Sequence, residues 1–390
     1  MSALWHWYDA ILFYTALFNL GMVFVCMVLL MRAGRMIKFL RDLPVPSGPL
    51  PKVSIIVPAR NEERNIAEAL TSLLSLDYPD YELLVVNDRS TDGTGAILDR
   101  LAAGQPRLKV VHISHLPGGW LGKNHAMHFA AGQASGELLL FTDADIVYQP
   151  TALARAVGYF RDQQLDHLAI GPDTRMPTWL LKSFVVMFCM MFYLYTRPWA
   201  IRNPKSSAHI GIGAFNLVRA DVYRATGGFA ALAMRPDDDL KLGKLIKKNG
   251  FRQDLLFGSD MICVEWYASV REMMVGLEKN TLAAVDYSLP FVVLYTSSML
   301  AFNVWPYLAV FLTWGATRWL YIAVALSLWG LALGSARNIG FRWHTALGFP
   351  LVVAILVFAT WRSVLLTYWR GGIRWRDTHY PLRELQANRV

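Results

Sequence analysis

The sequence predicts an α/β fold with a mostly parallel sheet in the middle of the chain and transmembrane helices at both ends. Three observations lead to this prediction. Short apolar runs alternate with helical patterns from Val53 to about Arg175, an uncharged run precedes them, and more uncharged stretches follow Tyr287. Strands that alternate with helices are typical of parallel sheets covered on both faces. Uncharged runs of about 20 residues are long enough to cross a bilayer as helices.

The first uncharged run, from Ile11 to Met31, has the flanks of a membrane anchor. An aromatic cluster precedes it, and a basic cluster follows it (Trp5, Trp7 and Tyr8; Arg32, Arg35, Lys38 and Arg41). Because the basic flank follows the apolar run, this is no ordinary cleavable signal peptide. The excess of basic residues after the run predicts that the chain beyond Arg41 is cytoplasmic.

The middle of the chain begins after a Pro/Gly-rich linker, Pro44 to Pro51. Apolar runs that predict buried strands then follow in order: VSIIVPA, YELLVVND, LKVVHIS, ELLLFTDAD and HLAIGPD. Helical patterns such as NIAEALTSLLSL and HAMHFAAGQA lie between them. Parallel sheets of this kind bind ligands beyond the carboxyl ends of their strands, so polar motifs at those ends have the greatest weight.

Apolar stretches in the second half predict further membrane contact. Residues 179–199 are expected to form an interfacial or half-buried helix, and 266–277 an amphipathic one. Three uncharged stretches near the end could each span: 291–313, 320–336 and 346–360. Three spans would leave the tail outside, whereas its five arginines favour the inside. The sequence leaves this conflict open.

Charge and cysteine content exclude other classes of protein. The net charge of +9 arises from basic residues beside apolar spans, which favours attraction to anionic lipids over nucleic-acid binding. The three cysteines (Cys26, Cys189 and Cys263) form no disulfide or metal motif. His125 and His128 share one helix face, but no third ligand motif that would indicate zinc lies near them.

Carboxylates follow two of the predicted strands. Asp88 ends one strand and could accept hydrogen bonds from a base or ribose, although Asp also serves turns and helix caps. Asp143 and Asp145 end another, where paired carboxylates can bind Mg²⁺ or Mn²⁺ through hard oxygen ligands. A D-x-D triplet is common by chance. Its place at the end of a buried strand is what favours the metal site.

Further along, a glycine-rich turn leads to Lys123 at the start of a helix, an arrangement suited to phosphate binding. By itself, this lysine could equally be an ordinary solvated side chain. Gly211 and Gly213 permit close approach of the backbone to a ligand. Asp237, Asp238 and Asp239 precede a helix. One aspartate would cap that helix, and repulsion within the triplet could raise the pKa of another enough to make a general base.

The order of these motifs (VPARNE, VNDRSTDGT, G-K, TDAD and a late acidic pair) resembles family 2 glycosyltransferases of the GT-A fold from Val53 to about Gly250. The late segment is similar to ceramide glucosyltransferases and their bacterial relatives. The tail from Ile373 to Arg383 is similar to their I-x-W-R-x-x-x-Y-x-L-R motif. One departure is clear: the Q/R-x-x-R-W motif of these families is missing from 273–277.

The resemblance implies roles position by position, for a reaction that uses a nucleotide-sugar donor, expected to be UDP-linked, and Mg²⁺ or Mn²⁺. The residues expected to bind the donor are Pro58, Ala59, Arg60, Glu62, Asp88 and Lys123, with Gly213 beside them. Asp143 and Asp145 would hold the metal. Asp239, or second to it Asp238, would deprotonate the acceptor for inverting attack.

Three regions are therefore expected: a transmembrane anchor at 1–43, a GT-A catalytic domain with interfacial helices at 44–286, and a C-terminal transmembrane region with a basic tail at 287–390. The expected function is transfer of a single sugar to a membrane lipid hydroxyl by a bacterial inner-membrane protein whose catalytic domain is cytoplasmic. Two alternatives stay open. One is a polysaccharide synthase, and the other is a nucleotide-sugar-binding protein without catalysis. The sequence indicates neither the sugar nor the oligomeric state.

Overall fold

The computed structural model describes residues 2–376 and 378–388, which form two compact units. The helical unit comprises 1–35, 176–195 and 267–370, and the sheet unit comprises 36–175, 196–266 and the chain from Gly371 onward. The C-terminal tail therefore belongs to the sheet unit, although residues 267–370 of the helical unit separate it in sequence from the rest of the sheet unit.

The sheet unit is built on an eight-stranded sheet of order β1-β10-β7-β9-β5-β2-β3-β4, in which only β9 is antiparallel to its neighbours among the described residues. Its strands are β1 (Lys38–Phe39), β2 (Val53–Ala59), β3 (Tyr81–Asp88), β4 (Leu108–Ile113), β5 (Leu138–Phe141), β7 (His167–Gly171), β9 (Asn216–Arg219) and β10 (Gln253–Phe257). The predicted mostly parallel α/β sheet is confirmed.

Two smaller sheets complete this unit. One has the order β6-β11-β8 (Ile146–Tyr148, Ile262–Glu265 and Asp173–Arg175), and the other is the tail hairpin of β12 (Gly372–Trp375) and β13 (Thr378–Pro381). The helices of the unit are η1 (Leu40–Asp42), α2 (Ile66–Leu74), α3 (Thr94–Ala102), α4 (Gly122–Gln133), α5 (Ala152–Asp162), η2 (Pro198–Ala200), α7 (Ala220–Ala225), η3 (Gly228–Leu232), α8 (Asp238–Lys248) and α14 (Leu382–Ala387).

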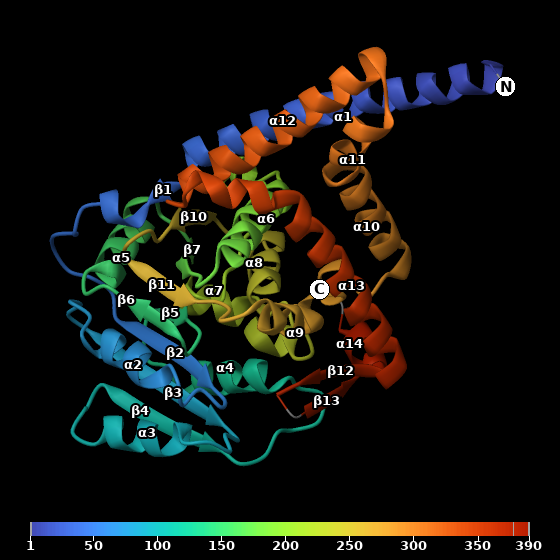
Figure 1. The fold of residues 1–390 in the computed structure, drawn as a ribbon. Helices are drawn as coiled ribbons and strands as arrows, with labels where there is room; N and C mark the ends of the chain where they lie inside the picture. The colour runs from blue at the N-terminus through green and yellow to red at the C-terminus, as the bar shows by residue number, and fades with distance from the viewer. Residues whose placement is uncertain (1, 377, 389–390) are drawn as a thin grey trace. The chain divides into compact units, whose positions relative to one another are not determined.

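Alternation along the central strands divides the apolar core into two layers, visible around the sheet in Figure 1. On β2, Ile55 and Val57 face a layer that includes α2, α3 and α5, whereas Ile56 faces a layer that includes α4, η3 and α8. Because successive side chains of a strand point to opposite faces, a strand buried on both sides must be apolar throughout. This is why VSIIVPA and YELLVVND are nearly continuous apolar runs.

The helical unit contains α1 (Ser2–Met36), α6 (Trp179–Thr196), α9 (Val270–Thr281), η4 (Ala283–Val285), α10 (Leu289–Asn303), α11 (Trp305–Leu312), α12 (Gly315–Asn338), η5 (Trp343–Gly348) and α13 (Phe349–Arg370). Within the described residues, four helical stretches are long and apolar enough to cross a membrane: Trp7–Met36, Trp179–Ala200, Gly315–Asn338 and Trp343–Arg370. A fifth span arises if the pair Val270–Val285 and Leu289–Asn303, bent by 113°, counts as one.

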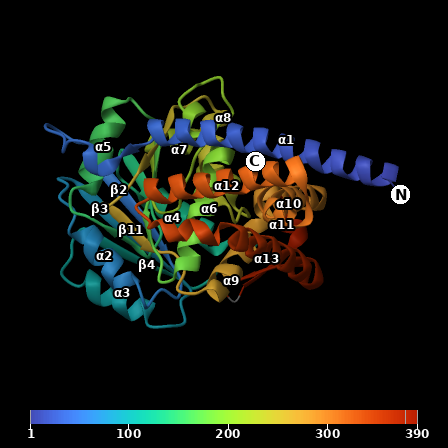
Figure 2. The same ribbon diagram turned by 45° about the horizontal axis from the view of Figure 1, so that its top comes forward.

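Helices α1 and α12 lie side by side and run in the same direction (Figures 1 and 2). Near their first turns the Thr317 hydroxyl donates to Asp9 at 3.0 Å. Near their last turns a Cβ on Gly34 would lie 3.3 Å from the Asn338 amide. Two parallel helices in one membrane have their amino ends on the same side. The chain must therefore return to the side of the α1 amino end before α12 begins.

The edge of β3 contains a buried carboxylate that the sequence did not single out. Glu82 is 5% exposed and accepts hydrogen bonds from Ser54 Oγ (2.7 Å), the Ser135 backbone N–H (2.7 Å) and Lys109 Nζ (2.8 Å). Burial alone would raise its pKa, but the hydrogen bonds from Lys109, Ser135 and Ser54 prevail and lower the pKa of Glu82 to about 2.

We expect Glu82→Gln to lower the free energy of unfolding by roughly 2–3 kcal/mol at neutral pH, because the depressed pKa means that the ionised group stabilises the fold. This stabilisation is present above about pH 4 and is lost as the pH falls toward 2. Thermal unfolding in detergent at pH 7 and pH 3, with the exposed Glu137→Gln as control, measures it. An equal loss of stability at both pH values would contradict the assignment.

Candidate active site

The loops after β2 and β3 are joined by hydrogen bonds. The Asn61 N–H donates to Ser90 Oγ at 3.0 Å, and the Glu62 N–H donates to Thr94 Oγ1 at 2.8 Å. In the other direction, the Thr91 N–H donates to Asn61 Oδ1 at 2.8 Å. Asn61 has a positive φ of 53°, a conformation that asparagine tolerates better than most residues. The RSTDGT segment therefore fixes the position of the loop that contains Glu62.

Asp88, the last residue of β3, lies among guanidinium groups. Its two carboxylate oxygens accept from Arg89 at 2.7 and 2.9 Å, and Arg60 Nη1 lies 3.7 Å away. A Cβ on Gly122 would come within 2.2 Å of Asp88 Oδ2, so only glycine lets the start of α4 approach this closely. Arg60 and Asp88, both predicted to bind the donor, therefore meet beside the amino end of a helix.

Two other predicted donor-binding residues end β2. Pro58 is partly exposed, but Ala59 is 1% exposed, backbone included, and packs in the apolar core. Of these two predicted residues, only Pro58 is therefore open to contact with a ligand.

Lys123, in the first turn of α4, lies between two aspartates. Its ammonium is 2.7 Å from Asp143 and 3.6 Å from Asp238. Burial favours the neutral amine, but the carboxylates of Asp143, Asp238 and Asp239 outweigh it and raise the pKa of Lys123. The lysine is therefore charged, and it links the end of β5 to the start of α8.

Asp239 is held by backbone donors. Its carboxylate accepts from the Gly213 N–H at 2.8 Å and the Leu240 N–H at 2.7 Å. Burial raises its pKa, and although Lys123 opposes this, the repulsion of Asp143 adds to it. A fixed carboxylate with a raised pKa is a suitable general base. A Cβ on Gly213 would lie 2.6 Å from Asp143 Oδ2, so the Asp143 carboxylate would have to shift, whereas its 3.5 Å separation from Asp239 Oδ2 is ordinary contact.

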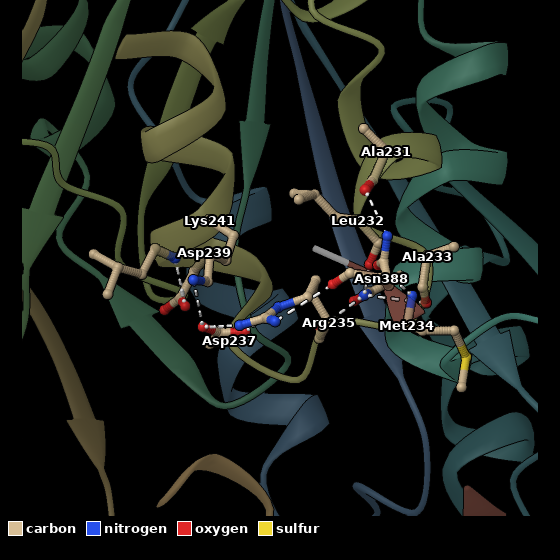
Figure 3. Close-up of polar contacts among 11 residues, drawn as sticks. Ala231, Leu232, Ala233, Met234, Arg235, Asp237, Asp239, Lys241 and Asn388 are labelled. Atoms are coloured by element: carbon tan, nitrogen blue, oxygen red, sulfur yellow. Dashed lines mark hydrogen bonds and ion pairs between the residues drawn. The ribbon is translucent and has the colours of Figure 1, made fainter. Parts of the chain in front are cut away.

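The other members of the acidic triplet have different partners. Asp237 precedes α8, but its carboxylate does not cap the helix; it pairs with Arg235 at 2.8 Å and with Lys241 at 3.7 Å, as Figure 3 shows. Arg235 is 1% exposed, so this ion pair is part of the interior. The triplet thus divides into a structural aspartate, one facing Lys123 and one facing Gly213.

Asp145 follows β5 beside other carboxylates. Burial and the negative charges of Asp143 and Glu62 raise its pKa to about 7. In the described part of the chain, no group of three or more His, Cys, Asp and Glu side chains could hold a metal. Two carboxylates at one strand end nevertheless fit Mg²⁺ or Mn²⁺, because Mg²⁺ sites commonly combine one or two carboxylates with substrate phosphates and water.

Sequence reasoning missed several residues that complete this region. Arg89 and Arg235 neutralise aspartates, and Arg376 and Tyr380 of the tail hairpin contact Glu62 and Gly122. The signal for the last two was the tail motif, which resembled the family but implied no role. Elsewhere, His125 and His128 pack around Trp120, in keeping with a structural rather than a zinc-binding role.

Comparisons with known proteins show which family part of the chain resembles and which fold it shares. Residues 54–227 match the family described as glycosyl transferase family 2. A beta-monoglucosyldiacylglycerol synthase of Synechocystis is 40% identical over 114 residues, which is 29% of this chain and 23% of that protein. A 4,4'-diaponeurosporenoate glycosyltransferase of Staphylococcus haemolyticus is 24% identical over 247 residues, 62% of this chain and 64% of that protein. The chain thus spans between a quarter and two thirds of these relatives.

Among solved structures, a mannosyltransferase from Pyrobaculum calidifontis in complex with GDP-Man and Mn²⁺ matches with a TM-score of 0.54 at 21% identity, covering 91% of this chain and 99% of that one. The sheet unit thus has the expected GT-A fold. The chain carries a glycosyltransferase family 2 domain, and the predicted resemblance and fold are confirmed.

We expect Gly213→Ala to weaken nucleotide-sugar binding and any turnover strongly, by about tenfold or more, because its Cβ would displace the carboxylate of Asp143. Gly118→Ala is the matched control, since a Cβ there meets nothing within 4 Å. Titration of the purified protein with nucleotide-sugar measures the difference. Equal affinity in the two variants would show that Gly213 does not shape the site.

Proposed function

We propose that this chain transfers one sugar from a nucleotide-sugar, a UDP-sugar in the first instance, to the hydroxyl of a membrane lipid, with inversion at the anomeric carbon. The observation that supports it most is the cluster at the carboxyl edge of the sheet, where Lys123 pairs with Asp143 and Gly213 holds Asp239. A cation (Lys123), a candidate metal ligand (Asp143) and a candidate base (Asp239) therefore lie beside the loops expected to bind a nucleotide.

The acceptor class follows from the helical unit and from the relatives. Four helices in the described part of the chain are long and apolar enough to cross a membrane, and two relatives are named for a glucosyldiacylglycerol product and a diaponeurosporenoate substrate. A lipid acceptor stays in the bilayer, so an enzyme that modifies it needs its active site near the membrane surface. The basic flank after α1 favours a bacterial inner-membrane protein with a cytoplasmic sheet unit.

In this reaction Asp239 accepts the proton of the acceptor hydroxyl. The hydroxyl oxygen then forms a bond to the anomeric carbon as the bond from that carbon to the diphosphate breaks, and the nucleoside diphosphate leaves with the electron pair. The Gly213 and Leu240 N–H groups hold the Asp239 carboxylate in place for this transfer. Lys123 offers its positive charge to the leaving diphosphate.

A divalent cation on Asp143 and Asp145 would neutralise charge on the departing diphosphate. It would also relieve the repulsion among buried carboxylates that raises the pKa of Asp145.

We expect Asp239→Asn to lower sugar transfer by about 10²–10⁴-fold, because the amide cannot accept the proton, while donor affinity changes little. Membranes containing the protein are incubated with labelled UDP- and GDP-sugars and lipid extract, and label in the organic phase is counted. Asp162→Asn, at a surface ion pair, is the control. Absence of labelled lipid with every donor, full activity of the Asp239 variant, or label in a polymer instead of a single-sugar lipid would refute the proposal.

We expect chelation with EDTA to abolish transfer and Mn²⁺ or Mg²⁺ to restore it. Asp145→Asn should require at least tenfold more Mn²⁺ for half-maximal rate, because one ligand oxygen loses its charge. Mn²⁺ binding followed by electron paramagnetic resonance gives an independent readout. Transfer that persists in EDTA would show that the carboxylates have another role.

A further inference from the structure

The last described segment of the chain is a hairpin that folds onto the sheet unit. Its register pairs Ile373 with Tyr380 and Trp375 with Thr378. Ile373 and Tyr380 are 1% and 5% exposed, so one face of the hairpin is buried. A hairpin of two short strands is only marginally stable by itself, and burial of this face is what stabilises it.

Two side chains of this tail reach the ends of two elements that form the candidate active site. Arg376 forms an ion pair with Glu62 after β2 and donates to the Asn61 carbonyl oxygen at 3.3 Å. Tyr380 accepts a hydrogen bond from the Gly122 N–H, the first residue of α4, at 3.3 Å.

The chain beyond the hairpin is anchored as well. Asn388 accepts from the Met234 N–H at 3.1 Å and donates to the Ala231 carbonyl oxygen at 3.1 Å (Figure 3). Its own carbonyl oxygen accepts from the buried Arg235 at 3.4 Å. The tail is therefore held at both of its ends, and the position of Arg376 is set by more than its own ion pair.

Arg376 brings positive charge to the acidic edge of the sheet. Lys123 pairs with Asp143, whereas Glu62, which interacts electrostatically with Asp143, pairs with Arg376. A guanidinium has five N–H donors in a planar fork that matches phosphate oxygens. The Arg376 side chain is 38% exposed, so its fork is accessible to a ligand from solvent.

We propose that Arg376 binds the diphosphate of the donor and that Glu62 holds the guanidinium in position before the donor arrives. This inference rests on the proposed function and deepens it, by making the tail hairpin a wall of the donor site. The ligand class is a nucleoside diphosphate. The nucleoside is expected at Arg60 and Asp88, so a monophosphate, which lacks the outer phosphate, should gain little from Arg376.

The test is binding of UDP, UMP, GDP and GMP to the full chain in detergent with Mn²⁺, measured by calorimetry. Arg376→Ala should bind the preferred diphosphate about 10- to 100-fold more weakly, as expected for a charged hydrogen-bonding group, and its monophosphate within about threefold of the wild type. Arg376→Lys, which keeps the charge without the fork, should lie between the two.

Arg383→Ala, at an exposed position on α14, is the matched control and should bind like the wild type. Thermal unfolding of each variant shows whether it is folded. If Arg376→Ala is misfolded, the diphosphate affinity of Arg376→Lys decides the test. Unchanged diphosphate affinity, or equal loss for diphosphate and monophosphate, would overturn the role of Arg376 alone. A wild-type chain that binds none of the four nucleotides would overturn the proposed function together with this inference.

Discussion

The ion pairs of Lys123 are the interaction on which the active-site edge depends. The carboxylates of Asp143 and Asp238 carry like charges, and a shared cation offsets the repulsion that opposes bringing the ends of β5 and α8 together. The ammonium contacts Asp143 and Asp238 at once. Its position at the start of α4 follows from Gly122, whose lack of a side chain lets the helix approach Asp88. Lys123, next to Gly122 at the start of α4, thus links α4 to the end of β5 and the start of α8.

The fold was predictable because burial leaves a clear pattern. The runs from Val53 to Ala59 and from Tyr81 to Asp88 are nearly continuous apolar runs because both faces of these strands are covered, and each begins and ends where predicted. The separate roles of the three aspartates were harder to predict from the sequence. Asp237, Asp238 and Asp239 are identical in type, and only three-dimensional neighbours (Arg235, Lys123 and Gly213) distinguish them.

The tail was the least predictable part. Its arginines suggested a side of the membrane, and its motif resembled a family, but no local pattern indicates that a segment more than 300 residues away in sequence will reach Glu62. The conflict over its side also has a structural answer. The tail folds with the sheet unit, so the two belong on one side of a membrane, and any crossings between residues 267 and 370 would be even in number.

The distance in sequence between the tail and the rest of the sheet unit has a consequence for how the protein folds during synthesis. The contacts between Arg376 and Glu62 and between Tyr380 and Gly122 join residues 314 and 258 positions apart. Loop-closure entropy makes such contacts slow to form. During synthesis the strands of the central sheet emerge before the helices of residues 289–370, and the tail hairpin emerges after both. The contacts of the hairpin with Glu62 and Gly122 therefore form late, after the apolar helices have been made.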